Sequence, residues 1–158
     1  MTVDTHPQLA ALLRGASLRV TGPRVAVLAE VQRRPHADAD TIATGVRHQI
    51  GSVSTQAVYD VLRALTEVRL VRRIEPAGSP ARYEARVGDN HHHLVCRRCG
   101  TIRDVDCAVG DTPCLSPSST LGFEIDEAEV VFWGLCPDCL PETQTAETQA
   151  SETPGNNQ

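Results

Sequence analysis

Residues 54–68 read STQAVYDVLRALTEV, and this stretch decides the fold class. Ser54 is a favourable helix N-cap, because its hydroxyl can accept a hydrogen bond from a free N–H of the first turn. Apolar residues then recur at the helical period, at Val58, Val61, Leu62, Leu65 and Val68. The stretch therefore predicts an amphipathic helix over about 55–68.

The segments on either side complete a recognisable unit. Capping residues, helical periodicity and the positions of Pro and Gly predict three earlier helices, over 7–15, 23–33 (capped by Thr21) and 39–49 (capped by Asp38). Downstream, the extended runs 70–75 and 81–86 are joined by a turn rich in Pro and Gly, which predicts a β-hairpin. Short helices followed by a hairpin indicate a winged helix-turn-helix, whose second helix of the pair enters the major groove of DNA.

The rest of the chain indicates a second, smaller domain, so the fold class is α+β. We expect a DNA-binding domain over 1–86, a hinge over 87–90 and a second domain over 91–140. Strands are predicted at 93–96, 101–106 and 123–133, and at most one helical turn within 107–122. Residues 141–158 have only Ala as apolar content, which predicts a disordered tail.

Composition excludes several classes of protein. Of the 158 residues, 41 % are hydrophobic, yet no uninterrupted apolar run approaches the length of a membrane span. The first residues lack the basic and apolar regions of a signal peptide. We therefore expect a cytoplasmic protein with no membrane partner, in a reducing compartment where cysteines bind metal more often than they form disulfides.

The net charge of −5 hides an asymmetry. Residues 1–90 hold 12 Arg and 9 acidic residues, whereas residues 91–158 hold 3 Arg and 11 acidic residues. The total charge argues against a nucleic-acid binder, but its division permits a basic DNA-reading half joined to an acidic half.

Two C-x-x-C pairs, Cys96/Cys99 and Cys136/Cys139, indicate a structural zinc site. Two intervening residues let both thiolates of a pair face one ion, and four thiolates leave no open coordination position. A thioredoxin-like redox pair or a disulfide would need only one such pair, and no fitting βαβ pattern is present. A zinc deaminase would need a His followed two positions later by Glu, which the chain lacks.

A second group of metal-ligand types surrounds the run of three histidines at 91–93. In a strand, His91 and His93 share a face while His92 points away. Imidazoles combined with oxygen donors from Glu84 and Asp104 would suit iron or manganese, and His36 lies in the DNA-binding half. The alternative is a solvated surface cluster.

Several motifs in order give the chain a family resemblance between about Leu12 and Cys139. They are LRVTGPR (18–24), RPHAD (34–38), STQAVY (54–59), RYE (82–84), HHHLVCRRCG (91–100) and GLCPDC (134–139). The chain resembles the ferric uptake regulator (Fur) family. The resemblance implies a homodimeric, metal-dependent transcriptional repressor with an N-terminal winged helix and a C-terminal α/β dimerisation domain stapled by a four-cysteine zinc site.

The resemblance also implies residue roles. The structural zinc falls on Cys96, Cys99, Cys136 and Cys139, and a regulatory Fe²⁺ or Mn²⁺ falls on His36, Glu84, His91, His93 and Asp104. A further family site would need a polar ligand where this chain has Ala128, so a complete third site is not expected. The usual long helix of the dimerisation domain is also not expected, because residues 108–122 are rich in Pro and Ser.

DNA contacts are expected mainly from the helix over 55–68. Hydroxyl and amide groups at its start can reach base edges or phosphates, and the resemblance places one Arg in the minor groove of an A/T-rich palindromic operator. The expected DNA-binding residues are Arg19, Arg24, Ser54, Thr55, Gln56, Tyr59 and Arg63, with Arg72 and Arg73 of the hairpin as further phosphate contacts. For any single Arg the alternative is a solvated face. Asp60 stands where relatives often carry a basic residue, which indicates a different base preference.

Asp104 and the segments 105–115 and 123–134 are similar to the actinobacterial FurA/CatR group of peroxide-responsive repressors. That similarity implies control of catalase-peroxidase genes and of the repressor's own gene, with release from DNA when bound Fe²⁺ and peroxide oxidise a ligand histidine. The alternative in the same family is an iron- or zinc-responsive metal-uptake repressor.

From other classes, a zinc-stapled protein-interaction module without a DNA target is also considered. A hydrolytic metalloenzyme is set aside, because five protein ligands leave little room for substrate and water. We therefore expect no enzymatic activity and no small-molecule substrate. Cys107 and Cys114 are expected to be ordinary loop cysteines, with a thiol switch as the alternative.

Overall fold

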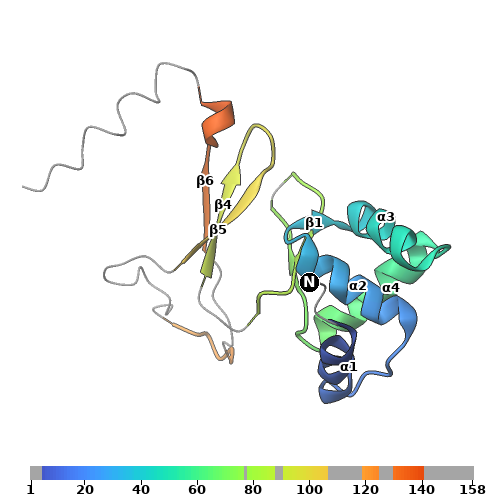
Figure 1. Ribbon diagram of the computed structural model, residues 1–158. Coiled ribbons are helices and arrows are strands. Elements are labelled where there is room, and N and C mark those ends of the chain that lie inside the picture. Colours follow the sequence, from blue (N-terminus) through green and yellow to red (C-terminus); the bar gives the residue numbers. More distant parts are fainter. Residues whose placement is uncertain (1–4, 77, 88–90, 107–118, 125–129, 141–158) are drawn as a thin grey trace, which may run out of the picture. The chain divides into compact units, whose positions relative to one another are not determined.

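The computed structural model describes residues 5–76, 78–87, 91–106, 119–124 and 130–140, which divide into two compact units, 1–89 and 90–158 (Figure 1). None of the helices within these described ranges combines the length and the hydropathy needed to cross a bilayer.

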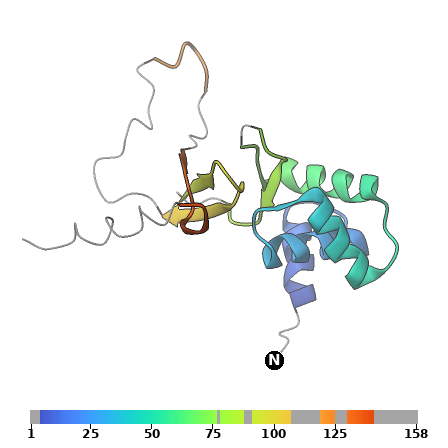
Figure 2. The same ribbon diagram turned by 90° about the horizontal axis from the view of Figure 1, so that it is seen from above.

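The first unit is a winged helix, as the sequence predicts. Its four helices are α1 (Thr5–Gly15), α2 (Gly22–Arg33), α3 (Ala39–Ile50) and α4 (Thr55–Glu67). Its antiparallel sheet has the order β1-β3-β2, formed by β1 (Ala37–Asp38), β2 (Arg72–Ile74) and β3 (Arg82–Glu84). Figure 2 shows the helical group of this unit from a second direction.

The helices begin at the caps that the sequence indicates. The side chains of Thr21, Asp38 and Ser54 accept hydrogen bonds from the backbone N–H three residues later, at 3.4, 2.8 and 3.1 Å. Each bond satisfies one of the N–H groups that a helix leaves without a partner at its start.

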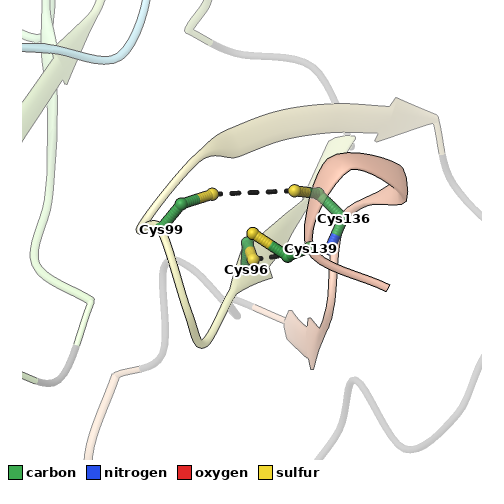
Figure 3. A group of neighbouring side chains, drawn as sticks. All are labelled: Cys96, Cys99, Cys136 and Cys139. Atoms are coloured by element: carbon green, nitrogen blue, oxygen red, sulfur yellow. Dashed lines mark hydrogen bonds between the residues drawn. The ribbon is translucent and has the colours of Figure 1, made fainter. Parts of the chain in front are cut away.

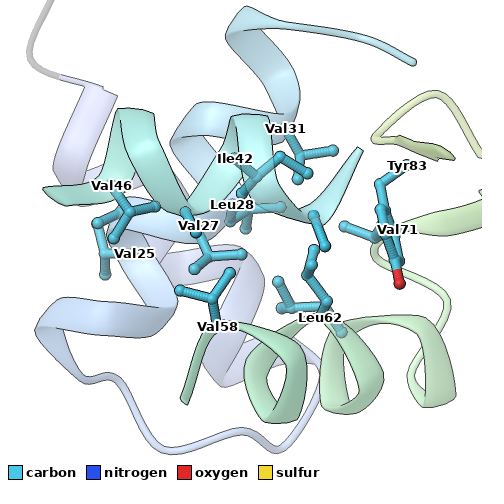
Figure 4. Packing of buried hydrophobic residues seen from close by; sticks show 14 of the residues in the cluster. Val25, Val27, Leu28, Val31, Ile42, Val46, Val58, Leu62, Val71 and Tyr83 are labelled. Atoms are coloured by element: carbon cyan, nitrogen blue, oxygen red, sulfur yellow. The ribbon is translucent and has the colours of Figure 1, made fainter. Parts of the chain in front are cut away.

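The core of this unit lies where α2, α3 and α4 meet the hairpin (Figure 4). From α4 it takes Val58, Leu62 and Leu65, each completely buried, while Val61 is half-buried at its edge. The helical period therefore predicts the buried face of α4 correctly, and the opposite face of the helix stays open to solvent.

The wing differs from the sequence prediction in two ways. Both hairpin strands are shorter than expected, and a two-residue strand, β1, pairs with β3 as a third member of the sheet. A two-residue strand has no periodicity of its own, so it could not be recognised. The pairing of β1 with β3 matters for the site, because it places His36, the residue before β1, beside the C-terminal end of β3.

Asp38 links β1, the wing and α3, and its charge gives a testable dependence on pH. The backbone N–H and the hydroxyl of Thr41, together with the nearby Arg82 guanidinium (3.4 Å), hold the pKa of Asp38 below its usual 3.8. Because the pKa is lowered by folding, the charge stabilises the fold above about pH 4, and this contribution disappears as the pH falls through the folded pKa.

We expect Asp38→Asn, which keeps a capping oxygen but loses the charge, to lower the free energy of unfolding by about 0.5–1 kcal/mol at pH 7. The difference from the wild type should be smaller at an acidic pH, below the usual 3.8, than at pH 7. Asp38→Ala, which also loses the cap, should cost about 1 kcal/mol more at pH 7. Urea titrations followed by helical circular dichroism test this. The same difference in free energy of unfolding between the wild type and Asp38→Asn at both pH values would contradict it.

Glu30, which the sequence reading did not single out, is completely buried in α2. Its carboxylate accepts hydrogen bonds from the Arg33 guanidinium and from Gln49 Nε2 (2.7 Å), and Arg34 Nε lies 3.1 Å from it. Room for the carboxylate exists because α3 carries Gly45 beside it, where a Cβ would overlap the Glu30 carboxyl group.

Gly45→Ala is therefore expected to destabilise the protein by about 1–3 kcal/mol through overpacking, although Ala is normally the better helix residue. Combined with Glu30→Ala, which removes the obstructing group, it should cost less than the sum of the two single changes. Thermal unfolding of the four proteins measures this coupling, and strict additivity would show that the two positions do not interact.

The second unit contains a three-stranded sheet of order β5-β4-β6. Strand β4 (His91–Cys96) pairs antiparallel with β5 (Ile102–Asp106) and parallel with β6 (Val131–Gly134), which is followed by a short 3₁₀ helix, η1 (Pro137–Cys139). The predicted strand over 123–133 is wrong at its start. Phe123 follows a turn in which Leu121 and Gly122 have positive φ, and it is 76 % exposed with no strand partner among the described residues.

The remaining sequence predictions for this part of the chain concern the hinge, the segment after β5 and the tail. They fall on residues 88–90, 107–118, 125–129 and 141–158, outside the described residues. Cys107, Cys114 and Ala128 are among them, so their predicted roles stay predictions.

Candidate metal centres and DNA-reading helix

The four cysteines of the two C-x-x-C pairs converge at one end of the second unit's sheet (Figure 3). Cys96 ends β4 and Cys99 lies in the turn to β5, while Cys136 and Cys139 follow β6. The turn closes through Gly100, whose φ of 72° is one that glycine adopts readily, and whose N–H donates to the Cys96 carbonyl. Because β4 and β6 are parallel neighbours, both pairs emerge at the same sheet end.

The sulfur geometry fits a tetrahedral zinc. All four sulfur atoms lie within 4.8 Å of one another, and Cys99 Sγ and Cys136 Sγ are 3.6 Å apart. Four thiolates at the usual zinc–sulfur distance are about 3.8 Å apart. The four cysteines that the structure describes are free thiols, so neither pair is a disulfide.

The pKa values of these thiols differ between the two pairs. Backbone N–H groups, that of Cys136 foremost, lower the pKa of Cys96 to about 6, and the hydroxyl and N–H of Thr101 lower that of Cys99. The neighbouring sulfur of Cys136 and burial raise the pKa of Cys139 to about 12, and burial raises that of Cys136. The second pair thus loses its protons readily only when a positive charge is present.

A histidine and a carboxylate meet in the wing of the first unit. His36 directly precedes β1 and donates its backbone N–H to the Tyr83 carbonyl, so the ladder places it opposite Glu84. His36 Nε2 lies 3.0 Å from Glu84 Oε2, with side chains 11 % and 1 % exposed, and Arg72 lies 3.8 Å from the same carboxylate. A buried nitrogen and a buried oxygen donor are thereby held side by side.

A second set of donors meets on the sheet of the other unit. His93 is paired with Asp104 across β4 and β5, and His91 lies two residues along the same face. Asp104 Oδ1 is 3.7 Å from His93 Nε2 and 4.0 Å from His91 Nε2, and both imidazoles are completely buried. His92 points away, with its ring 5.9 Å from that of Phe132. Each unit therefore assembles its own nitrogen and oxygen donors, a combination suited to a divalent iron or manganese ion.

The solvent face of α4 carries Gln56, Tyr59, Asp60 and Arg63, spaced so that they share one side of the helix. They line a groove of about 860 Å³ bounded by α4, the start of α3 and the β2–β3 hairpin. Tyr59 is 44 % exposed although it is aromatic, which leaves its ring available for contact. This is the face that a winged helix presents to the major groove.

The other predicted DNA-binding residues have mainly local contacts. Arg24 donates to the Arg19 carbonyl (2.8 Å), Ser54 caps α4, and Thr55 accepts from Arg47. In the hairpin, Arg73 pairs with Glu75, while Arg72 is directed at Glu84.

Two arginines that support the reading helix and the cysteine-bearing sheet were not predicted from the sequence. Arg47 donates to the Val53 carbonyl (3.1 Å) and to Thr55 (2.7 Å), which holds the turn between α3 and α4. Arg97 lies over the ring of Trp133, 5.3 Å from its centre, on the sheet that carries the cysteines. Neither contact follows from spacing, because both depend on how separate elements pack.

Comparison with known proteins agrees with this arrangement. The sequence model of the ferric uptake regulator family matches residues 15–132. The chain is 65 % identical over 137 residues to the transcriptional regulator FurA of Mycobacterium tuberculosis, covering 87 % of this chain and 93 % of that protein. It is 61 % identical over 122 residues to ferric uptake regulation protein 1 of Mycolicibacterium fortuitum, covering 77 % and 76 %.

Among solved structures, the ferric uptake regulator of Pseudomonas aeruginosa with manganese has a TM-score of 0.62 at 25 % identity, covering 82 % of this chain and 98 % of that one. The resemblance read from the motifs is thereby confirmed. The winged helix, the cluster of four cysteines and the match across residues 15–132 lead to one conclusion: the chain belongs to the ferric uptake regulator family, whose members are transcriptional regulators and not enzymes.

Proposed function

We propose that this protein is a cytoplasmic, metal-dependent repressor that binds a palindromic, A/T-rich operator as a homodimer and leaves it on oxidation by peroxide. Members of its family bind DNA as dimers. The exposed face of α4 would enter the major groove, with Arg19, Arg24, Ser54, Thr55, Gln56, Tyr59 and Arg63 as the DNA-binding residues.

Cys96, Cys99, Cys136 and Cys139 would hold a structural zinc. The convergence of the four sulfur atoms within 4.8 Å of one another supports this assignment. Since no coordination position stays open, the ion's contribution is to the folding of the second unit and not to chemistry.

The regulatory cation would be Fe²⁺ or Mn²⁺, bound by His36 and Glu84 of the first unit together with His91, His93 and Asp104 of the second. The observation that carries the proposal is that each unit already buries its own histidines beside a carboxylate. The Pseudomonas aeruginosa relative is named as a manganese-containing structure. A cation shared by both units would stabilise one arrangement of the two reading helices, so that metal affinity becomes DNA affinity.

Peroxide sensing is what the resemblance to the actinobacterial FurA/CatR group implies, a group that the Asp at position 104 and the 65 % identity to a FurA both support. The chemistry that Fe²⁺ would supply at this site is the reduction of peroxide. The oxidant so formed would react with an imidazole beside it. Oxidation of His36, His91 or His93 would remove a nitrogen that binds the cation. Loss of the cation would then release the operator. The expected targets are a catalase-peroxidase gene and the repressor's own gene.

The experiment that tests this uses the full-length, zinc-loaded protein and a labelled A/T-rich palindrome. Binding is measured with Mn²⁺ and, without oxygen, with Fe²⁺, each before and after one equivalent of peroxide. We expect only the iron form to lose the DNA, with an oxygen atom added to a peptide containing His36 or residues 91–93. Retained binding without oxygen addition would overturn peroxide sensing.

Retained DNA binding without oxygen addition would instead favour an iron- or zinc-responsive metal-uptake repressor. This alternative is supported by the name of the Mycolicibacterium fortuitum relative. The two functions use the same donors, so the discriminating variable is the oxidation of the protein and not its affinity for metal. Failure of every metal to promote DNA binding would overturn both.

A further inference from the structure

A carboxylate on the DNA-reading face of α4 is unexpected, because that face meets a polyanion. Asp60 is exposed there beside Tyr59, on the side of the helix opposite the buried Val58 and Leu62. No ion pair of Asp60 exists among the described residues, and Arg63 one turn away pairs with Glu67 (3.9 Å). Water solvates this exposed carboxylate in the free protein, and on bound DNA its favourable partner would be a hydrogen-bond donor or a positive group.

Asp60 is held in a defined orientation. Gln56 Nε2, one turn earlier, donates to Asp60 Oδ1 at 3.0 Å. Gln56 is also the only hydrogen-bond partner of Asp60 within the described part of the chain, so the second carboxylate oxygen keeps its accepting capacity. Both side chains line the groove between α4 and the hairpin, where they are solvent-accessible.

An ionised carboxylate only accepts hydrogen bonds. In the major groove, the exocyclic amines of cytosine and adenine are donors, whereas guanine and thymine present acceptors that a carboxylate repels. Adenine also exposes its N7 acceptor beside the amine, while cytosine exposes only a C–H there. Cytosine is therefore the base whose edge best complements Asp60.

We infer that Asp60, oriented by Gln56, is a specificity-determining residue that accepts a hydrogen bond from the N4 amine of a cytosine in each operator half-site. The inference rests on the proposed function, since it requires α4 to read the major groove. It assigns the sequence preference to a direct contact at one position, and it gives Gln56 the role of a positioning residue.

Simple repulsion is the competing explanation. The same groove is lined by further acidic residues, including Glu67 and Glu75, and Asp60 could be one more charge that weakens contact with phosphates. Repulsion acts equally on every sequence and depends on salt, whereas a base contact acts at one position. Glu67→Gln, which removes a charge from the same helix and groove, is the matched control.

The experiment uses the full-length protein loaded with Zn²⁺ and Mn²⁺. An operator is first selected from random palindromic DNA, and affinities are then measured for operators carrying cytosine, 5-methylcytosine or thymine at each symmetric position. 5-Methylcytosine keeps the amine and thymine replaces it with a carbonyl, while both carry the same methyl group. The wild type, Asp60→Asn, Asp60→Ala, Gln56→Ala and Glu67→Gln are compared.

We expect the wild type to bind the 5-methylcytosine operator about 10-fold more tightly than the thymine operator at one symmetric pair of positions. Asp60→Ala and Asp60→Asn should abolish this ratio, Gln56→Ala should reduce it, and Glu67→Gln should leave it unchanged. A wild type that binds its operator without such a ratio at any position overturns the inference and leaves the proposed function intact. A uniform rise in affinity with Asp60→Ala, with the ratio kept, also overturns it. Absence of metal-dependent DNA binding overturns both.

Discussion

Replacing Cys136 with Ser is expected to unfold the second unit and to leave the first one folded. The second unit's described sheet has only three strands, of six, five and four residues, and little apolar surface to bury. Zinc bound by four thiolates contributes about 10–16 kcal/mol to folding in small zinc domains, far more than such a sheet could replace. The first unit keeps its own core, which contains no residue of the second.

The chain's single tryptophan makes this measurable. Trp133 lies on β6 beside the cysteines, half-buried under Arg97, so its fluorescence reports on the second unit alone. In Cys136→Ser we expect red-shifted emission and loss of bound zinc, while helical circular dichroism is largely kept. Cys107→Ser is the control and should retain one zinc per chain. Native Trp133 emission in zinc-free Cys136→Ser would contradict the account.

Leu62→Ala is expected to cost about 2–5 kcal/mol of the first unit's stability, because it leaves a cavity at the centre of the core. Leu62 is completely buried where α4 meets the other helices. Single domains have only about 5–15 kcal/mol in total, so a substantial fraction of this unit would unfold near physiological temperature. Urea titrations followed by helical circular dichroism measure the change.

The neighbouring residue supplies the control for this variant. Val61 is half-buried on the same helix, so Val61→Ala should cost less than half as much. Trp133 fluorescence should not change in either variant during the transition of the first unit. Equal costs at 61 and 62 would mean that the helical face is assigned wrongly.

The sequence predicted elements whose signal is local. The caps Thr21, Asp38 and Ser54 and the period of residues 55–68 fix the helices before any tertiary contact is known, because capping and amphipathicity act within one or two turns. The two C-x-x-C pairs were equally readable, since their spacing reflects the ion and not the surrounding fold.

Features that depend on pairing between distant segments could not be read in this way. Strand β1 exists only because β3 passes beside it, and the strand expected from Phe123 fails because its start has no partner in the described structure. The buried Glu30 is visible only with Gly45 opposite it, and the orientation of Asp60 requires knowing that Gln56 turns toward it. The donor types at positions 36, 84, 91, 93 and 104 could be predicted from residue chemistry, whereas their pairing within each unit depends on strand register.

The central claim is that one exchangeable cation takes ligands from both units, and binding of Mn²⁺ to the zinc-loaded protein tests it most directly. Equilibrium dialysis with electron paramagnetic resonance detection gives the stoichiometry and affinity for the wild type, His36→Ala, His93→Ala and the control His48→Ala, whose exposed imidazole lies on α3. We predict one tight site per chain in the wild type and in His48→Ala, weakened at least 10-fold by either of the other changes. Wild-type affinity in His36→Ala would show that the cation belongs to the second unit alone and would contradict the claim.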